Sequence, residues 1–339
     1  MQIGLHVSKF QWPDGPANLA TDLVRVATAA EEAGFRALSV MDHLFAVPWN
    51  GEVEDSMLEA YTTLGFLAAS TKRMNLLAMV TATTFREPGL LAKAVTTLDV
   101  LSKGRAWLGI GAGFYEAETT GLGLPLPSVS ERFERMEETL QIVLQMWSES
   151  EDPYQGQHYQ LGRTLNSPQA LTRPHPPILI GGGGEKKTLR LVAQYAQKCN
   201  LFGSPELEHK LAVLRTHCDE VGRNFDDIEK TVGAQLDPGP NGENVETILE
   251  QLRAWSALGV THVQTAIPNV ASLTSIEIFA ERIIPVARDV GHHGLGETGS
   301  RFRRLHNDEV PELRVLWIRR SCAGPDQFFN QFIGYRLVS

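Results

Sequence analysis

Short apolar runs alternate with longer stretches of helical spacing along most of the chain. The runs have the usual length of β-strands, and the longer stretches repeat apolar residues with a period near 3.6. The eight predicted strands are residues 2–7, 37–41, 75–80, 106–110, 177–180, 199–202, 229–234 and 261–266. The predicted helices that follow them are residues 19–33, 56–71, 89–101, 130–147, 186–196, 206–221, 245–258 and 273–288.

Eight strand–helix units within about 290 residues favour the α/β class and a closed (β/α)8, or TIM, barrel. The main alternative is a doubly wound sheet that binds a dinucleotide and carries GxGxxG at its first strand–helix turn. Here the first turn, residues 8–16, holds one glycine, and the glycine clusters follow the fourth and fifth strands instead. The pattern therefore predicts the barrel.

Two long connections and the last segment depart from this alternation. Residues 45–55 and 148–176 are long loops, which on a barrel usually form lids or walls of a binding site, and residues 156–161 predict a small hairpin. We expect a barrel domain at residues 1–290 and a separate tail at residues 291–339, because the tail contains no strand–helix unit. The tail is expected to be disordered or artefactual, with a basic arm or an oligomer contact as the alternative.

Composition and charge narrow the class of protein. Hydrophobic residues make up 42% of the chain and charged residues 21%, which is typical of a globular protein. The net charge of −9 argues against a general nucleic-acid binder. Three distant cysteines without a CxxC pair predict neither a disulfide framework nor a zinc site, and fit a reducing cytosol. With no secretory signal and no long apolar run, we expect a cytoplasmic protein without membrane contact.

Barrel enzymes carry their sites on the loops after the strands, so polar residues at strand ends are the candidates for chemistry. Asp42 and His43 end the second strand, and histidine can donate, accept or relay a proton near neutral pH. The alternative is a structural histidine held by its neighbour. After the third strand, the hydroxyls that begin at Thr81 and the guanidinium of Arg86 either bind polar ligand atoms or form a salt-bridged helix-entry loop.

Two glycine clusters follow the next two strands. Gly111, Ala112 and Gly113 let a ligand approach the backbone closely, or simply form a tight turn. The second cluster leads directly into a helix N-terminus with lysines nearby, which predicts a phosphate cradle, or alternatively a flexible turn. Its glycines are Gly181, Gly182, Gly183 and Gly184. The chain lacks the P-loop spacing, a GxSxG elbow and a metal-ligand motif, so we expect no metal.

With these motifs in view, residues 1–290 resemble the bacterial luciferase-like superfamily of flavin monooxygenases and reductases. The most specific stretch runs from Arg173 through the second glycine cluster to Arg190, and is similar to the actinobacterial branch that depends on the deazaflavin coenzyme F420. The other matching stretches are residues 30–35, Asp42 with His43, residues 85–88 and residues 108–113.

The resemblance implies that the ring of F420 lies across the strand ends, with FMN as the alternative cofactor. The cofactor phosphate is then expected at the second glycine cluster, near Lys186, Lys187 and Thr188. A strained, often cis, peptide behind the ring is expected at about Met79-Val80. The remaining cofactor-binding candidates that the resemblance implies are Asp42, Thr81, Gly111, Ala112 and Gly113.

The resemblance also implies that His43 is the proton donor or relay, with Glu116 as the catalytic acid or with no partner acid. The family's sugar-phosphate dehydrogenases carry a glutamate directly after the strand-four glycines, where this chain has Phe114, so a sugar-phosphate substrate is not supported. We expect an oxidoreductase that moves a hydride between the deazaflavin C5 and a small organic, apolar or aromatic, substrate. The alternatives are an FMN-dependent monooxygenase that uses oxygen and a non-catalytic flavin-binding protein. A homodimer is the expected assembly.

Overall fold

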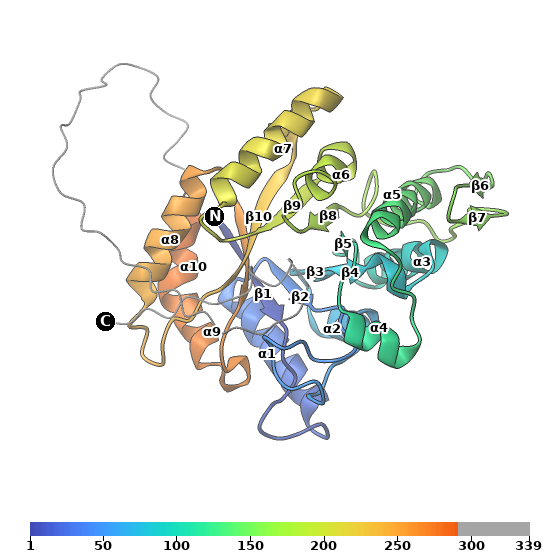
Figure 1. Ribbon diagram of the computed structural model, residues 1–339. Coiled ribbons are helices and arrows are strands. Elements are labelled where there is room, and N and C mark those ends of the chain that lie inside the picture. Colours follow the sequence, from blue (N-terminus) through green and yellow to red (C-terminus); the bar gives the residue numbers. More distant parts are fainter. Residues whose placement is uncertain (291–339) are drawn as a thin grey trace, which may run out of the picture. The chain divides into compact units, whose positions relative to one another are not determined.

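The computed structural model describes residues 1–290, and the predicted tail at residues 291–339 lies outside the described residues. Nine parallel strands form one sheet in the order β3-β2-β1-β11-β10-β9-β8-β5-β4, with helices around its outside (Figure 1). Its strands are β1 (Gln2–Val7), β2 (Ala37–Val40), β3 (Asn75–Ala78), β4 (Thr81–Ala82), β5 (Leu108–Gly111), β8 (Ile178–Gly181), β9 (Lys198–Phe202), β10 (Glu229–Gln235) and β11 (His262–Ala266).

The ring of strands closes through the third predicted strand, which the structure divides into β3 and β4. β3 pairs with β2, β4 pairs with β5, and a parallel bridge joins Leu76 to Ala106. Eight strand positions therefore surround the barrel axis, which confirms the predicted TIM barrel. The break between β3 and β4 is the cis peptide Met79-Val80, at the position where the resemblance placed it.

The helices follow the strands in the expected order. Those around the barrel are α1 (Leu19–Ala33), α2 (Ala60–Ser70), α3 (Pro88–Leu101), α5 (Val129–Met146), α6 (Thr188–Tyr195), α7 (Leu207–Val221), α8 (Val245–Ala257), α9 (Thr274–Ile278) and α10 (Ile284–Asp289). A π-helical stretch, Phe279–Ile283, joins the last two. The predicted hairpin is present as β6 (Tyr154–Gln155) paired antiparallel with β7 (Gln160–Leu161).

Side-chain caps set two helix starts that the pattern misplaced. α2 begins at Ala60 instead of residue 56, because the Glu59 carboxylate accepts a hydrogen bond from the Thr62 backbone N–H at 2.7 Å. α5 begins after Ser128, whose hydroxyl accepts from the Glu131 N–H at 3.3 Å, and not at Ser130. Ser128 and Glu131 have the S-x-x-E spacing of a capping box.

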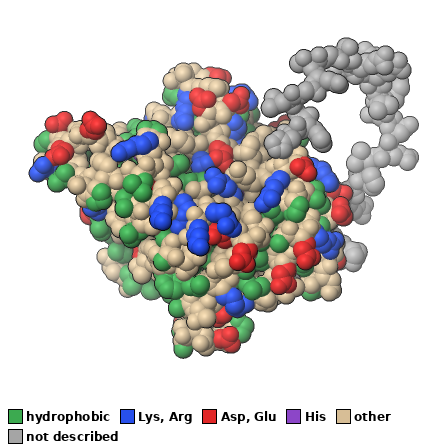
Figure 2. All heavy atoms as spheres, turned by 180° about the vertical axis from the view of Figure 1, so that it is seen from behind, with side chains coloured by type: hydrophobic (Ala, Val, Ile, Leu, Met, Phe, Trp, Pro, Cys, Tyr) green, Lys and Arg blue, Asp and Glu red, His purple; other side chains and the backbone are tan. Residues whose placement is uncertain are grey.

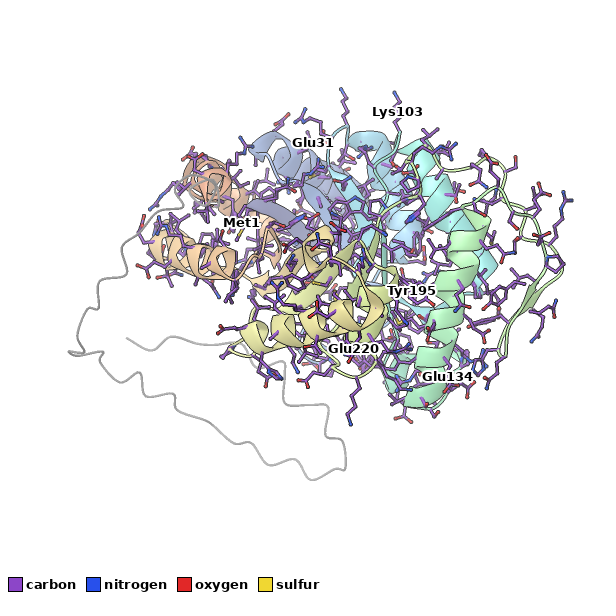
Figure 3. All side chains as sticks on the ribbon, turned by 90° about the horizontal axis from the view of Figure 1, so that it is seen from above. Met1, Glu31, Lys103, Glu134, Tyr195 and Glu220 are labelled. Carbon is purple, nitrogen blue, oxygen red and sulfur yellow. The ribbon has the colours of Figure 1, made fainter. Side chains whose placement is uncertain are left out.

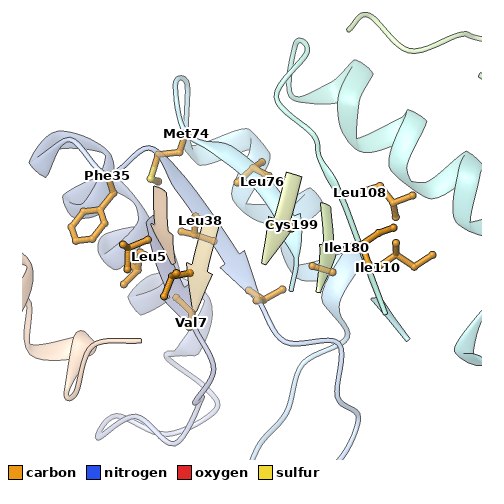
Figure 4. Close-up of a cluster of buried hydrophobic side chains, with 14 of the residues drawn as sticks. Leu5, Val7, Phe35, Leu38, Met74, Leu76, Leu108, Ile110, Ile180 and Cys199 are labelled. Carbon is orange, nitrogen blue, oxygen red and sulfur yellow. The ribbon is translucent and has the colours of Figure 1, made fainter. Parts of the chain in front are cut away.

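Alternation along the strands separates two apolar regions. Leu5, Leu38, Leu76 and Ile180 belong to the large cluster in which the barrel wall packs against the helices (Figure 4). A second, smaller cluster contains Ala37, Leu77, Trp107 and Leu179, with Val80 packed against it. These residues alternate with the first set along the same strands, so they fill the barrel interior.

Polar contacts join the helices to the barrel and to one another. Glu31 on α1 accepts hydrogen bonds from the backbone N–H groups of Lys72, Arg73 and Met74, just before β3 (Figure 3). Burial alone would raise the pKa of Glu31, but these backbone donors and the Arg73 charge lower it below its usual value. Tyr195, at the end of α6, donates to a carboxylate of α5 and so joins the two helices.

One face of the described part of the protein is mixed in charge. Acidic and basic side chains are interspersed over the face shown in Figure 2. Among residues 1–290, no helix has the length and apolar character that crossing a bilayer requires.

Candidate active site at the carboxyl ends of the strands

His43 lies just beyond the end of β2 and is held by a buried carboxylate. Its Nδ1 lies 2.7 Å from Oε1 of Glu118, whose side chain is 1% exposed. The other oxygen of Glu118 accepts from the backbone N–H groups of Leu44 at 2.7 Å and Phe45 at 3.3 Å. One carboxylate therefore fixes both the His43 ring and the backbone that follows it.

Glu118 comes from a short helix that the sequence pattern missed, α4 (Glu116–Leu122). Successive residues on an α-helix are about 100° apart, so Glu116 and Glu118 point to nearly opposite sides of α4. Glu118 and Thr119 are its buried residues, while Glu116 is exposed to solvent. Of the two carboxylates, the structure brings Glu118 to His43 and leaves the sequence candidate Glu116 at the surface.

Three aromatic rings pack against the His43 ring. The rings of Trp49, Phe114 and Tyr115 all meet the imidazole edge-on, at centroid distances of 6.5, 5.4 and 5.9 Å. Trp49 also stacks on Phe114 at 5.8 Å. Phe114 is 54% exposed, so this aromatic wall combines a polar imidazole with an accessible apolar surface.

The buried carboxylate of Asp42 holds together the segments around the site. It accepts two hydrogen bonds from Arg86, at 2.7 and 2.8 Å, and one from the Ala82 N–H at 3.1 Å. Burial raises the pKa of the Asp42 carboxyl, and the hydrogen bonds from Arg86 oppose that effect. Arg86 also donates to Glu59 at 2.5 Å and lies 4.9 Å above the Tyr61 ring. Asp42 and Arg86 therefore connect the end of β2, β4 and the start of α2.

The cis peptide Met79-Val80 places the Val80 side chain between two of the predicted cofactor-binding glycines. A Cβ on Gly111 would lie 2.8 Å from one Val80 methyl, and a Cβ on Gly181 would lie 2.8 Å from the other. These distances are too short for real Cβ contacts, so both positions require glycine as long as Val80 is present. Nearby, the Thr81 hydroxyl pairs with the Tyr61 hydroxyl at 2.7 Å.

Gly113 closes the β5 end with a left-handed backbone conformation, φ 73°. Next to it lie two buried polar atoms that make no hydrogen bond within residues 1–290, Oγ1 of Thr84 and Nε of Arg132. Arg132 donates through another nitrogen to the Gly113 carbonyl. Ala112, between the two glycines, is partly buried against the core.

The second glycine cluster forms the turn between β8 and α6. Gly182 donates to the Asn200 carbonyl at 3.0 Å and has a φ of 116°, a conformation that favours glycine. The backbone N–H groups of Gly183 and Gly184 donate to no described residue. Thr188 is buried at the first position of α6. Lys187, the preceding residue, donates from Nζ to the Ser130 hydroxyl of α5 at 3.0 Å.

These residues meet at one end of the barrel because parallel strands all end on the same side. The structure thus brings His43 and both glycine clusters to one face, where the strand-end pattern placed them, together with the Val80 region, which the resemblance implied. It adds Glu118 and the aromatic wall, which the sequence did not single out in these roles. Within residues 1–290, no three His, Cys, Asp or Glu side chains gather in a way that could hold a metal ion.

Fold and site together combine a (β/α)8 barrel with a histidine–carboxylate pair and a glycine-rich turn at the barrel mouth. A family model for luciferase-like monooxygenases matches residues 1–303, and the chain belongs to this family of oxidoreductases. It is similar to an F420-dependent glucose-6-phosphate dehydrogenase of Microbacterium testaceum, with 30% identity over 86% of this chain and 93% of the relative.

Solved structures of low sequence identity share the fold. An F420-dependent secondary alcohol dehydrogenase, solved with an F420-acetone adduct, aligns with a TM-score of 0.72 at 20% identity, over 85% of this chain and 99% of the other. The F420-dependent tetrahydromethanopterin reductase of Methanopyrus kandleri aligns with a TM-score of 0.69 at 17% identity, over 84% and 98%. A monooxygenase from Streptomyces bottropensis aligns with a TM-score of 0.67 at 20% identity, over 84% and 99%.

Proposed function

We propose that this protein is an F420-dependent oxidoreductase that transfers a hydride between the deazaflavin C5 and a small, uncharged organic substrate. The observation that carries the proposal is the pairing of His43 with the buried Glu118 at the barrel mouth, 2.7 Å apart. The F420-dependent dehydrogenases among the relatives support the choice of cofactor.

The residues present fit a cofactor that carries a phosphate. The turn at Gly183 and Gly184 offers free backbone N–H groups at the start of α6, and the helix dipole there favours negative charge. Lys187 is the residue before α6, and its Nζ donates to the Ser130 hydroxyl of α5. The glycines at 111 and 181, with Val80 between them, leave a surface of backbone and small side chains on which a flat ring system can lie.

The chemistry that a bound deazaflavin supplies is two-electron hydride transfer at C5. The chain's own part is to hold the substrate and to move one proton. Glu118 accepts from Nδ1–H of His43, so the neutral ring carries its lone pair on Nε2. When an alcohol is oxidised, Nε2 takes the hydroxyl proton, and the Glu118 carboxylate stabilises the resulting imidazolium. In the reverse direction the same nitrogen returns the proton to a carbonyl oxygen.

The charges around the mouth argue for an uncharged substrate. A phosphorylated sugar needs cationic partners for its phosphate. The strand-end loops at residues 41–59, 203–206, 236–244 and 267–273 contain no lysine or arginine, and the loop after β1 contains one lysine, Lys9. Arg86 is already bound to two carboxylates. We therefore propose an apolar or aromatic alcohol or carbonyl compound, which the Trp49 and Phe114 rings would contact, instead of the substrate named for the dehydrogenase relatives.

Cofactor choice is tested by fluorescence titration of the full-length chain, first with F420 and then with FMN. Tight binding of F420 and weak binding of FMN supports the proposal, and the reverse result would move the protein to the oxygen-using, FMN-dependent alternative. Lys187→Ala is expected to weaken F420 binding severalfold, while the matched variant Lys72→Ala, on the exposed loop before β3, leaves it unchanged. Binding of neither cofactor would contradict the phosphate cradle.

Substrate class is tested separately with the F420-loaded protein under anaerobic conditions. Reduction of F420 is followed with benzyl alcohol, cyclohexanol and glucose 6-phosphate as probes. Turnover with an apolar alcohol and none with the sugar phosphate supports the proposed class. Efficient turnover of glucose 6-phosphate would refute that class while leaving the cofactor assignment intact. A cofactor-loaded protein that turned over no member of a broad alcohol and carbonyl screen would favour a binding protein.

A further inference from the structure

A chain of polar side chains runs through the barrel interior toward the active-site face. Glu229 at the start of β10 lies 3.4 Å from Nδ1 of His262, and Nε2 of His262 lies 3.4 Å from Nε2 of Gln264. The Gln264 Oε1 accepts from the Ser39 hydroxyl at 3.4 Å, and Ser39 Oγ lies 2.9 Å from Nδ1 of His6 on β1. These five side chains come from four neighbouring strands.

The direction of each hydrogen bond in this chain follows from its charged end. Burial alone would raise the pKa of Glu229, but His262 and Lys198 lower it to about 2. The carboxylate is therefore ionised and can only accept hydrogen bonds. Burial lowers the pKa of His262, so its ring is neutral. Among residues 1–290 its Nδ1 makes no hydrogen bond, but it faces the Glu229 carboxylate at 3.4 Å, and that negative charge favours the proton on Nδ1. Its Nε2 must then accept from the amide nitrogen of Gln264.

The same logic continues to the barrel mouth. The Gln264 nitrogen is committed to His262, so its oxygen faces Ser39. The Ser39 hydroxyl proton can go to this oxygen at 3.4 Å or to the Leu5 carbonyl at 3.5 Å, and both of these oxygens only accept. Ser39 Oγ is left as the acceptor for His6, whose Nδ1 must donate. The proton of the neutral His6 ring is thereby fixed on Nδ1, and the lone pair is on Nε2.

We propose that His6 is a second ligand-binding imidazole, held as the Nδ1–H tautomer by this interior chain, whose Nε2 accepts a hydrogen bond from a hydroxyl of the substrate. His6 is only partly buried, lies one residue before the end of β1, and is close enough to His43 for their charges to interact. The inference of a hydroxyl-bearing ligand rests on the proposed function.

The two imidazoles then have different tasks. Burial, together with the nearby His43, lowers the pKa of His6 to about 4, so His6 stays neutral when His43 gains its proton. His43 has the Glu118 carboxylate to stabilise its charged form, whereas the partner of His6 is an uncharged hydroxyl. His6 therefore holds the ligand, and His43 carries the proton.

The tautomer is tested without cofactor or turnover, by ¹⁵N NMR of the full-length protein with labelled histidine. His6→Asn assigns the His6 signals by their loss. We expect Nδ1 protonated and Nε2 unprotonated from pH 8 to pH 5 in the wild-type protein, and a mixture of tautomers in Ser39→Ala. The Nε2–H tautomer in the wild-type protein, or protonation of His6 near neutral pH, would overturn the proposal. Because this experiment needs no F420, it stands even where the proposed function fails.

The binding role is tested by adding benzyl alcohol to the F420-loaded protein. We expect the His6 Nε2 resonance to shift on saturation, while that of His158, on the β6–β7 hairpin, does not. His6→Leu should weaken benzyl alcohol three- to tenfold in KM, the value of one hydrogen bond between uncharged groups, with kcat changed less than twofold. His158→Asn should change neither. An unshifted His6 signal, or an equal loss in kcat, would overturn the ligand-holding role.

Discussion

Replacing Glu118 by glutamine separates the charge of this residue from its shape. Glutamine keeps one acceptor oxygen and gains an NH2 group, while three donors face it in the wild-type protein: His43 Nδ1 and the N–H groups of Leu44 and Phe45. If the amide oxygen faces the two backbone donors, the NH2 group faces His43. The imidazole must then move its proton to Nε2 and accept through Nδ1.

The opposite orientation of the amide would leave two backbone donors unpaired, at about 1–3 kcal/mol for each buried group. We therefore expect the first orientation, with a modest loss of stability and a large loss of activity. The lone pair of His43 would no longer face the substrate, and positioned acid–base catalysis contributes about 10²–10⁴ in rate. The expected result for Glu118→Gln is a fall in kcat of at least about a hundredfold, with F420 affinity unchanged.

The assay is single-turnover reduction of F420 by an alcohol substrate in an anaerobic stopped-flow instrument, together with urea unfolding of the same samples. Glu116→Gln, two residues away on the exposed side of α4, is the matched comparison and should stay within about threefold of the wild-type rate. Full activity of Glu118→Gln with a collapse in Glu116→Gln would refute the assignment of the proton-transfer pair and restore Glu116 as the catalytic acid.

Four further substitutions probe the barrel frame and the substrate pocket. Glu31→Gln should lower the free energy of unfolding at pH 7 by about 1.5–3 kcal/mol, because the charged acceptor of three backbone donors is lost. Folding lowers the pKa of Glu31, so its contribution to stability in the wild-type protein is complete above the unfolded-state pKa. That contribution is lost as the pH falls through the folded-state pKa, and urea unfolding between pH 7 and pH 3 would show the loss. Gly181→Ala should cost about 1–3 kcal/mol through its contact with Val80, and Val80→Ala in the same chain should restore part of that loss in a double-mutant cycle. Phe114→Ala should leave the unfolding midpoint nearly unchanged, because the ring is half exposed. The same substitution should raise KM for benzyl alcohol more than for isopropanol. Equal changes in KM for both alcohols would count against an aromatic contact.

The barrel could be predicted because alternation of strands and helices is a repeated, local signal. The break in the third strand followed from the resemblance alone, since nothing in the letters around Met79 and Val80 marks a cis peptide. The starts of the helices at Ala60 and Val129 depend on which of several nearby polar residues caps the backbone. For the helix at Val129, the spacing alone did not distinguish Ser128 from Ser130.

The positions of residues that follow a strand could be predicted from the sequence. The positions of residues that depend on side-chain packing could not. His43 follows a strand, so its position at the mouth was evident. Glu118 lies in a seven-residue helix with too few apolar residues to show a period, and only its burial distinguishes it from Glu116. His6 stands inside a predicted strand, where a single polar residue gives no sign that it faces Ser39 across the sheet.

The valine between the two glycines also constrains how this family member can change over evolutionary time. Val80 comes from the third strand position, Gly111 from β5 and Gly181 from β8, so three segments distant in sequence share one small volume. A larger residue at either glycine is excluded while Val80 is present. If position 80 becomes smaller first, the intermediate protein merely contains a small void. We expect related sequences to show these three positions changing together, with position 80 changing first.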